Sequence, residues 1–196
     1  MRICVFCASS TRIDPRHPAL AAELGTELGR RGHSLVSGGG SVSSMGAVAA
    51  AVRAAGGLTL GVIPQPLLDL EVADQAADEL LVTETMRERK ALMDDHSDAF
   101  IVLPGGIGTL EELFEIWTAR TLGMHDKPIV VLDPDGVLAP VRELVVGLVE
   151  SRFARPVVLE AITWTTTVAD ALAAVEVTGA AMATPTAEEQ LEAEPS

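Results

Sequence analysis

The sequence predicts an α/β protein, a single three-layer domain with a doubly wound parallel sheet between helices. Two observations favour this class. Short apolar, β-branched runs alternate along the chain with segments of helical period, which is typical of a parallel sheet wrapped by helices. The 196 residues are 48% hydrophobic and 21% charged, which is enough apolar material for one packed core. We therefore expect a soluble globular protein.

Three strands and two helices are predicted in the first half of the chain. Apolar runs indicate strands at 3–7, 35–36 and 58–63, and apolar residues at helical spacing indicate helices at about 17–31 and 44–55. The second helix consists of small residues and stops at Gly56-Gly57, because glycine favours the turn that ends a helix. Prolines at 64 and 66 follow the third strand, so we expect 64–78 to be a loop or a mobile lid.

The second half continues the alternation. Strands are expected at 80–83, 99–103, 129–132 and 162–163, and helices at 86–96, from the turn at 104–106 to about 122, at 137–151 and at 168–175. The residues after 177 are mostly Ala, Thr, Pro and Glu, a composition that does not form a core. We therefore expect one Rossmann-like domain over 1–177 and an acidic, disordered tail over 178–196.

The charge balance restricts the partners of the protein. Lys and Arg number 14 against 28 Asp and Glu, a formal net charge of −14. General binding to nucleic acid or to an anionic membrane is disfavoured, because both need a basic surface. The sequence shows no signal-peptide pattern and no apolar run of about 20 residues that would span a bilayer. We therefore expect neither nucleic acid nor a membrane as a partner.

The two cysteines are expected to be structural. Cys4 and Cys7 are three positions apart in a predicted strand, so their side chains face opposite sides of the sheet. This geometry excludes a redox or zinc-binding Cys-x-x-Cys pair, and no second pair completes four metal ligands. Buried thiols of this kind indicate a reducing cytoplasm.

Metal-dependent and serine hydrolases lack support in the sequence. The histidines are scattered, without the spacing of a metal site, at His17, His33, His96 and His125. The chain contains no Gly-x-Ser-x-Gly motif, the turn that presents a nucleophilic serine. We expect no metal and no cofactor.

Two of the loops that follow predicted strands are rich in glycine, and ligands of open parallel sheets bind beyond the carboxyl ends of the strands. The stretch PGGIGTLEE at 104–112 joins a strand to a helix. Its glycines allow the backbone to approach a ligand, and the free N–H groups of the helix start attract an anion. The same residues fit a capping box, with Thr109 as N-cap and Glu112 folding back on it. From the residues alone, both interpretations remain open.

The second glycine-rich stretch, SGGGSVSSMG at 37–46, is a weaker match to a phosphate loop. It lacks the third glycine of the dinucleotide fingerprint and follows the second strand, so binding of a nicotinamide or flavin dinucleotide is disfavoured. The chain also contains no Gly-Lys pair, which excludes a P-loop kinase or ATPase.

A cluster of cations opens the helix after the fourth strand. In ETMRERKALM at 84–93, Thr85 and Glu88 fit a capping box, and the first turns carry Arg87, Arg89 and Lys90. The helix dipole opposes such charges by about 0.3–1 kcal/mol per exposed residue. Nearby glutamates, or else a bound phosphate or a buried carboxylate, are expected to compensate. Met86 and Met93 share a helix face with Arg89. This face fits an apolar ligand wall or the core, and of the two we expect the core.

These motifs resemble those of the Lonely Guy family. The resemblance covers about residues 2–160 and rests on PGGIGTLEE at 104–112, RERK at 87–90 and GGGSVSSMG at 38–46. Further similar stretches are FCASS at 6–10, SDAFIVLPGG at 97–106 and LGMHDKPIVVL at 122–132. The chain departs from the family pattern, in ways that bear on substrate preference, at Ala8, Ser43-Ser44 and Ile107.

The resemblance implies hydrolysis of the N-glycosidic bond of adenosine 5′-monophosphates, with N6-prenylated forms giving the free cytokinin and ribose 5-phosphate. It implies Arg89 and Glu112 as the catalytic pair. The phosphate contacts that it implies are Gly105, Gly106, Gly108 and Thr109, with Lys90 and the loop of Gly38, Gly39 and Gly40 nearby. The implied nucleoside contacts are Ser9, Glu71 and Met86. It also implies a homodimer.

Two other functions remain open. A protein that binds a nucleotide or a cofactor without turnover would use the same loops. A decarboxylase, the older label of the family, requires a lysine that forms a Schiff base with pyridoxal phosphate. Lys127 precedes its strand and so lies at the wrong edge of the sheet, and Lys90 stands among cations that suit phosphate. The helix around Phe114 and Trp117 is expected to supply either a dimer interface or part of the core.

Overall fold

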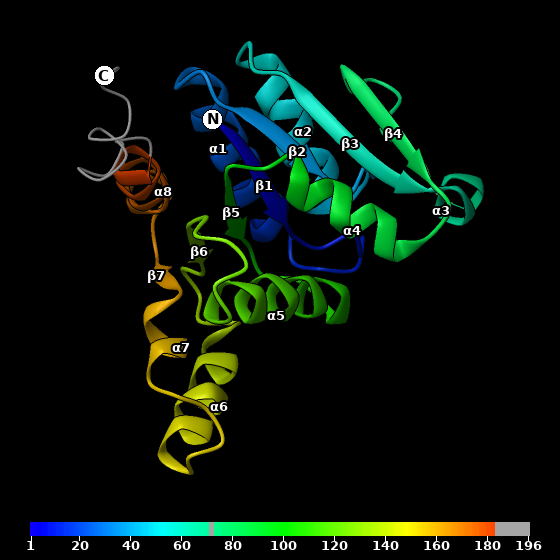
Figure 1. The fold of residues 1–196 in the computed structure, drawn as a ribbon. Helices are drawn as coiled ribbons and strands as arrows, with labels where there is room; N and C mark the ends of the chain where they lie inside the picture. The colour runs from blue at the N-terminus through cyan, green and yellow to red at the C-terminus, as the bar shows by residue number, and fades with distance from the viewer. Residues whose placement is uncertain (71–72, 183–196) are drawn as a thin grey trace, which may run out of the picture.

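The computed structural model describes residues 1–70 and 73–182 and contains one sheet of seven parallel strands. The strands are β1 (Arg2–Phe6), β2 (Ser34–Ser37), β3 (Thr59–Pro64), β4 (Glu79–Thr83), β5 (Ala99–Val102), β6 (Ile129–Leu132) and β7 (Thr163–Thr165). Their order in the sheet is β4-β3-β2-β1-β5-β6-β7. The chain therefore builds outward from β1 in one direction, returns to β5 beside β1, and builds outward in the other direction (Figure 1). This confirms the doubly wound sheet.

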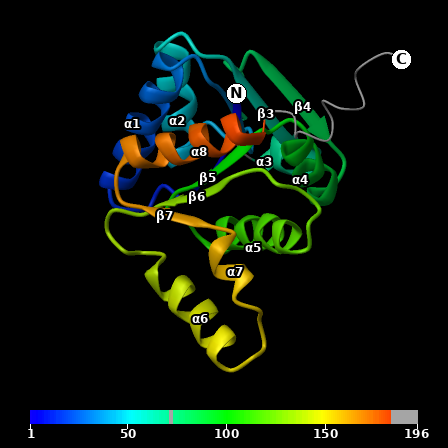
Figure 2. The same cartoon turned by 60° about the vertical axis from the view of Figure 1, so that its left-hand side comes forward.

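Helices cover both faces of the sheet. They are α1 (Arg16–Arg30), α2 (Ser43–Ala54), α3 (Gln65–Leu70), α4 (Met86–Asp95), α5 (Ile107–Thr121), α6 (Ala139–Glu150), α7 (Val157–Glu160) and α8 (Val168–Met182). One apolar cluster joins the sheet to α1, α2 and α8, and a second joins it to α4, α5 and α6. The two groups of helices lie on opposite sides of the strands in Figure 2. The three-layer prediction is therefore confirmed.

Strand β1 shows why this sequence forms a central strand. Ile3 and Val5 belong to the first cluster, whereas Cys4 and Phe6 belong to the second, and all four are buried. This is the two-residue period of a strand covered on both faces. Cys7 continues the alternation into the first cluster. The two cysteines therefore lie on opposite faces and are free, buried thiols, as predicted.

The structure differs from the sequence prediction in three segments. The expected loop or lid at 64–78 begins with the short helix α3, and the unpredicted helix α7 precedes β7. Helix α8 continues to Met182, so the helix extends past the boundary predicted at 177, while 183–196 lie outside the described residues. None of the helices described is long and apolar enough to cross a membrane.

Candidate active site

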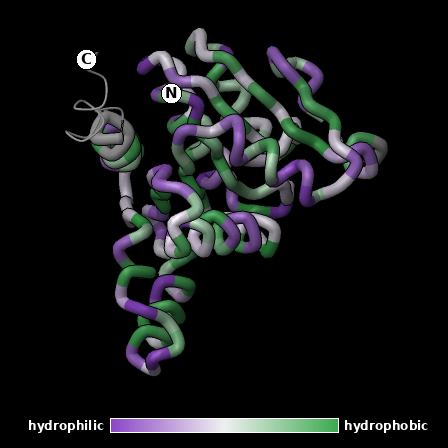
Figure 3. The backbone as a smooth tube through the Cα atoms, in the orientation of Figure 1, coloured by the Kyte–Doolittle hydropathy of each residue, from purple (hydrophilic) through white to green (hydrophobic). Residues whose placement is uncertain are grey.

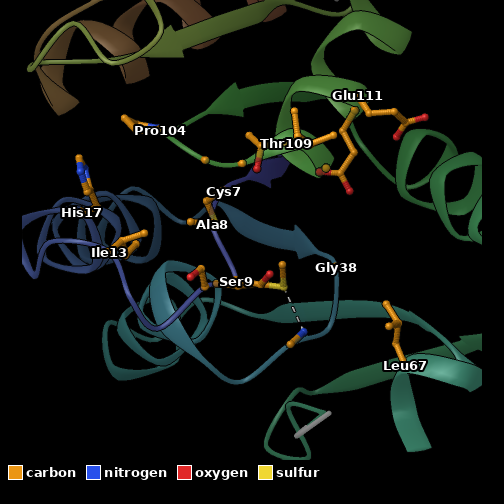
Figure 4. Close-up of a pocket in the computed structure, with 18 of the residues that line it drawn as sticks. Cys7, Ala8, Ser9, Ile13, His17, Gly38, Leu67, Pro104, Thr109 and Glu111 are labelled. Atoms are coloured by element: carbon orange, nitrogen blue, oxygen red, sulfur yellow. Dashed lines mark hydrogen bonds between the residues drawn. The ribbon is translucent and has the colours of Figure 1, made fainter. Parts of the chain in front are cut away.

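A pocket of about 490 Å³ lies at the carboxyl edge of the sheet. It sits beside the ends of β1 and β5, the neighbours between which the strand order reverses. Ligands of open α/β sheets bind in the crevice at such a switch point. The pocket wall brings together predicted site residues from four separate segments (Figure 4), namely Ser9, Gly38, Gly40, Met86, Arg89, Gly105, Gly106, Gly108, Thr109 and Glu112.

Two of the predicted site residues that the structure describes are not part of this wall. Lys90 lies on a different surface, where its Nζ bonds to Glu111 and lies 2.6 Å from Glu115 Oε2. Gly39 turns away with a φ of 75° and accepts a hydrogen bond from the Asp74 N–H through its carbonyl. Glu71 lies outside the described residues.

The glycine-rich loop 104–108 opens helix α5. The helix begins at Ile107 with Gly106 as its N-cap and without a side-chain cap. Of the two interpretations left open for this stretch, the capping box at Thr109 and Glu112 is therefore not formed. A Cβ added to Gly105 would lie 2.1 Å from the Thr109 hydroxyl oxygen, which explains why this position requires glycine. The first amides of a helix have no carbonyl partner inside the helix. They therefore present N–H groups and the positive end of the helix dipole to the pocket.

Glu112 meets Arg89 instead of its own helix start. Arg89 Nη1 donates to Glu112 Oε1 at 2.7 Å, and Arg89 Nε donates to the Val62 carbonyl at 3.1 Å. The two residues are only 5% and 8% exposed. The sequence left open how the cations at the start of α4 are compensated. A buried carboxylate compensates Arg89, and nearby exposed glutamates compensate Lys90.

Burial and the arginine act in opposite directions on Glu112. Burial raises the pKa of its carboxyl group and Arg89 lowers it, and the net effect is a raised pKa. A carboxyl group with a raised pKa is a stronger base than an ordinary glutamate, which suits a group that accepts a proton during a reaction. Burial, and then the charge of Glu112, raise the pKa of the neighbouring Cys7 thiol to about 12. The thiol stays protonated and is not a nucleophile.

Helix α4 positions the arginine. Thr85 Oγ1 accepts from the Glu88 N–H and Glu88 Oε2 accepts from the Thr85 N–H, both at 3.2 Å, so the predicted capping box is present. Met93 is buried, as expected for the core, but Met86 is 46% exposed and lines the pocket. The core prediction for Met86 is therefore wrong, because this residue sits at the helix start where the pocket opens.

The second glycine loop is tied to the loop after β1. Ser43 adopts a φ of 57°, and its hydroxyl donates to the Ser10 carbonyl at 2.6 Å. The Gly40 N–H donates to the sulfur of Met45 at 3.1 Å, the dashed line in Figure 4. These bonds fix the two walls of the pocket that carry Ser9 and Gly38.

Gly38 makes room for the guanidinium group. A Cβ at this position would lie 1.8 Å from Arg89 Nη2. We expect Gly38→Ala to displace the guanidinium from Glu112 and to lower activity by about 10²-fold, since misplacement of about 1 Å has this effect on other catalytic groups. Steady-state assays of the variant, with Gly147→Ala as a control at an open helical position, measure this effect. Full activity of Gly38→Ala would contradict a role for the guanidinium position.

Several pocket residues were not found by sequence reasoning. The apolar lining includes Ile13, Leu67 and Val137, and the polar lining includes His17. His17 lies at the start of α1, directly after the loop that leaves β1. The only sequence signal for His17 as a site residue was its position after the end of a predicted strand, because the segment between β1 and α1 has no glycine-rich motif.

Together, the fold and the site define a Rossmann-like α/β protein whose crevice holds a buried carboxylate–guanidinium pair next to a glycine-rich helix start. Residues 45–175 match the family described as "Possible lysine decarboxylase". The chain belongs to this family, the Lonely Guy family.

Two relatives of the chain carry the same name. The cytokinin riboside 5′-monophosphate phosphoribohydrolase of Mycobacterium tuberculosis is 52% identical over 88% of this chain and 91% of its own length. The Arabidopsis thaliana protein of that name, LOG5, is 44% identical over 79% of this chain and 68% of its own. A solved molybdenum cofactor carrier protein from Chlamydomonas reinhardtii has a TM-score of 0.70 and 24% identity, covering 91% of this chain and 98% of its own. At that identity the likeness shows the fold alone.

Proposed function

We propose that this chain hydrolyses the N-glycosidic bond of adenosine 5′-monophosphates, including N6-modified forms, and releases the free base and ribose 5-phosphate. The observation that carries the proposal is Glu112, a buried carboxylate held by Arg89 at 2.7 Å in a pocket that the glycine-rich start of the same helix also lines. The names of relatives at 52% and 44% identity support the same reaction.

The order of groups along the pocket suits a nucleotide. The 5′-phosphate is assigned to the start of α5, at Gly105, Gly106, Gly108 and Thr109, where amide groups and the dipole attract an anion. The ribose follows at Glu112, and the base extends toward Met86 and the apolar Leu67. Ser9 and Gly38 line the remaining wall.

The reacting centre is the anomeric carbon of the ribose. Departure of the purine leaves an oxocarbenium-like sugar, so a carboxylate beside that carbon stabilises the developing positive charge. The raised pKa of Glu112 lets the same group accept a proton from an attacking water. Arg89 holds the carboxylate in one orientation, since its own Nε is fixed by the Val62 carbonyl. Both side chains are positioned before the substrate arrives.

A decarboxylase does not fit the site. The two lysines are Lys90, which is bonded to two glutamates, and Lys127, whose Nζ contacts the carboxylate and the carbonyl of Asp94 at 2.7 Å. Neither belongs to the pocket wall as far as the described residues define it. No lysine is therefore placed to form a Schiff base with pyridoxal phosphate there.

Product analysis tests the proposed reaction. Purified protein is incubated with adenosine monophosphate, with isopentenyladenosine monophosphate and with adenosine, and the base and sugar products are measured over time. We expect base and ribose 5-phosphate in equal amounts from the nucleotides and little product from adenosine, because phosphate binding supplies energy for orientation at the sugar. Stoichiometric binding of the nucleotide without products would favour the carrier alternative instead.

We also propose that the protein forms a homodimer through the face between α4 and α5. This face has a groove of about 700 Å³ next to apolar side chains that are 39% (Phe114), 62% (Leu122) and 74% (Met124) exposed. Trp117 belongs to the core instead, because it is 2% exposed and its Nε1 donates to the Val158 carbonyl. Figure 3 also shows hydrophobic stretches along α6 and α7.

Sedimentation measures the dimer directly. We expect the wild type to sediment as a dimer and the double variant Leu122→Asp with Met124→Asp to sediment as a monomer, because charges at an apolar interface are costly. Leu58→Asp, at an equally exposed leucine outside this face, serves as the control. A monomeric wild type at micromolar concentration would refute the interface.

The free, buried state of Cys4 and Cys7 leads us to propose a cytoplasmic location. Cell fractionation with an antibody against the protein tests it. Recovery with the cytoplasmic markers is expected, and recovery with secreted proteins would contradict it.

A further inference from the structure

One basic side chain in the pocket wall has no partner. Glu112 is bonded to Arg89, and Glu111, which also lines the pocket, is bonded to Lys90. The imidazole of His17 lines the same pocket. Within residues 1–70 and 73–182 it makes neither a side-chain hydrogen bond nor an ion pair. A half-buried group that hydrogen bonds this readily is suited to meet a ligand.

The position of His17 indicates which part of a ligand it meets. In Figure 4, His17 and Pro104 lie at one end of the pocket, Leu67 lies at the other, and Thr109 lies between them. His17 therefore stands beside the loop that opens α5, on the side away from the apolar end. If the base points toward Leu67, the 5′-phosphate lies at the end where His17 stands.

The charges in the pocket point to the same assignment. A phosphate monoester brings about 1.5 to 2 negative charges at pH 7, and Glu111 and Glu112 already line the wall. The charge of Arg89 is balanced by Glu112, because its Nη1 donates to that carboxylate at 2.7 Å, and its Nε donates to a carbonyl. The amides of α5 contribute only partial charges. Among the lining residues that are described, His17 is thus the remaining group that can carry a full positive charge.

We propose that His17 is a substrate-contacting residue whose imidazolium donates a hydrogen bond to the 5′-phosphate of the bound nucleotide. The inference rests on the proposed function, since it takes the ligand to be a nucleoside monophosphate. A protonated imidazole binds a phosphate better than a neutral one, so affinity for the substrate falls from acidic to alkaline pH. The charged groups around this histidine are Asp14 and Arg16 on its own segment, Asp135 paired with Arg16, and Arg89, Glu111 and Glu112 in the pocket wall.

Kinetics of two substitutions test the contact. We expect His17→Asn to raise KM for adenosine monophosphate about tenfold at pH 6, the effect of one lost charge-assisted hydrogen bond, with kcat little changed. The slow reaction of adenosine stays unaffected. The wild-type KM rises between about pH 6 and pH 8, whereas that of His17→Asn does not. His17→Lys restores a low KM at pH 8, because lysine keeps its charge there.

Binding of ribose 5-phosphate provides a readout that needs no turnover. In nuclear magnetic resonance titrations we expect this ligand to move the imidazole signals of His17 in the wild type and to bind His17→Asn about tenfold more weakly. His96→Asn, at the end of α4 and away from the pocket wall, is the control and leaves both measurements unchanged.

The outcomes separate this inference from the proposed function. Two results overturn the phosphate contact. The first is an unchanged KM in His17→Asn. The second is a fall in kcat alone that disappears when the substrate has a leaving group that needs no proton. The second result would assign His17 to protonation of the base. If the wild type releases no base but binds ribose 5-phosphate through His17, the proposed reaction fails while the contact stands.

Discussion

Glu112→Gln is expected to lower the release of base by about 10³-fold, the size of effect found for a preorganised charge or general base. Glutamine has nearly the same shape and still accepts a hydrogen bond from Arg89 Nη1, but it neither carries a charge nor accepts a proton. The fold is therefore retained. Steady-state assays give the activity, and circular dichroism with thermal unfolding gives the state of the fold.

Glu176→Gln is the matched control. Glu176 also pairs with an arginine, since Arg31 Nη1 lies 3.0 Å from its Oε2, but it belongs to α8 and lies away from the pocket. The control variant is expected to keep full activity. Full turnover by Glu112→Gln together with a lower melting temperature would show that Glu112 is only structural.

Arg89→Met is expected to lose both activity and stability. Methionine leaves Glu112 buried without its cation, and removing one partner of a buried ion pair costs about 3 to 5 kcal/mol of unfolding free energy. Turnover is lost because the carboxylate no longer has a fixed orientation. Urea unfolding and steady-state assays measure the two effects.

The stability loss in Arg89→Met depends on pH. The pKa of Glu112 is already raised in the fold, and without the arginine it rises further, since the arginine is the group that lowers it. An acid whose pKa is raised on folding contributes stability below its unfolded pKa, and this contribution is lost as the pH rises through the folded pKa. The deficit relative to wild type therefore grows from acidic to neutral pH. In the Arg89→Met, Glu112→Gln double variant we expect a smaller deficit at neutral pH that no longer grows as the pH rises, because no carboxyl group is left at position 112. Equal deficits at neutral pH in the single and double variants would contradict the pairing.

The two capping-box patterns show what the sequence could predict and what it could not. The pattern at Thr85 and Glu88 forms the box, whereas the same pattern at Thr109 and Glu112 does not. In the second case the helix starts earlier, at Ile107, and Arg89, 23 residues away in sequence, binds the carboxylate. Local spacing predicts a local contact, but it contains no information on a partner that only the tertiary fold brings close.

The main elements were predictable because their signals are strong. The strands around Ile101 and Val130 are continuous apolar runs bounded by turn residues, and parallel strands buried on both faces have this pattern. The missed helices α3 and α7 are short and lie next to prolines, where periodicity carries little information. The family resemblance implied Lys90 near the phosphate, but Lys90 directly follows Arg89, and successive residues on a helix point in different directions. The structure places its Nζ on the glutamates of α5.

A crystal structure of Glu112→Gln with adenosine monophosphate tests the proposed geometry most directly, because the inactive variant should hold the substrate intact. The anomeric carbon is predicted to lie about 3.5 Å from the side chain at position 112 or from a water bound to it, with the phosphate at the start of α5. A nucleotide bound with its sugar turned away from position 112, or bound in the groove between α4 and α5, would contradict the proposal.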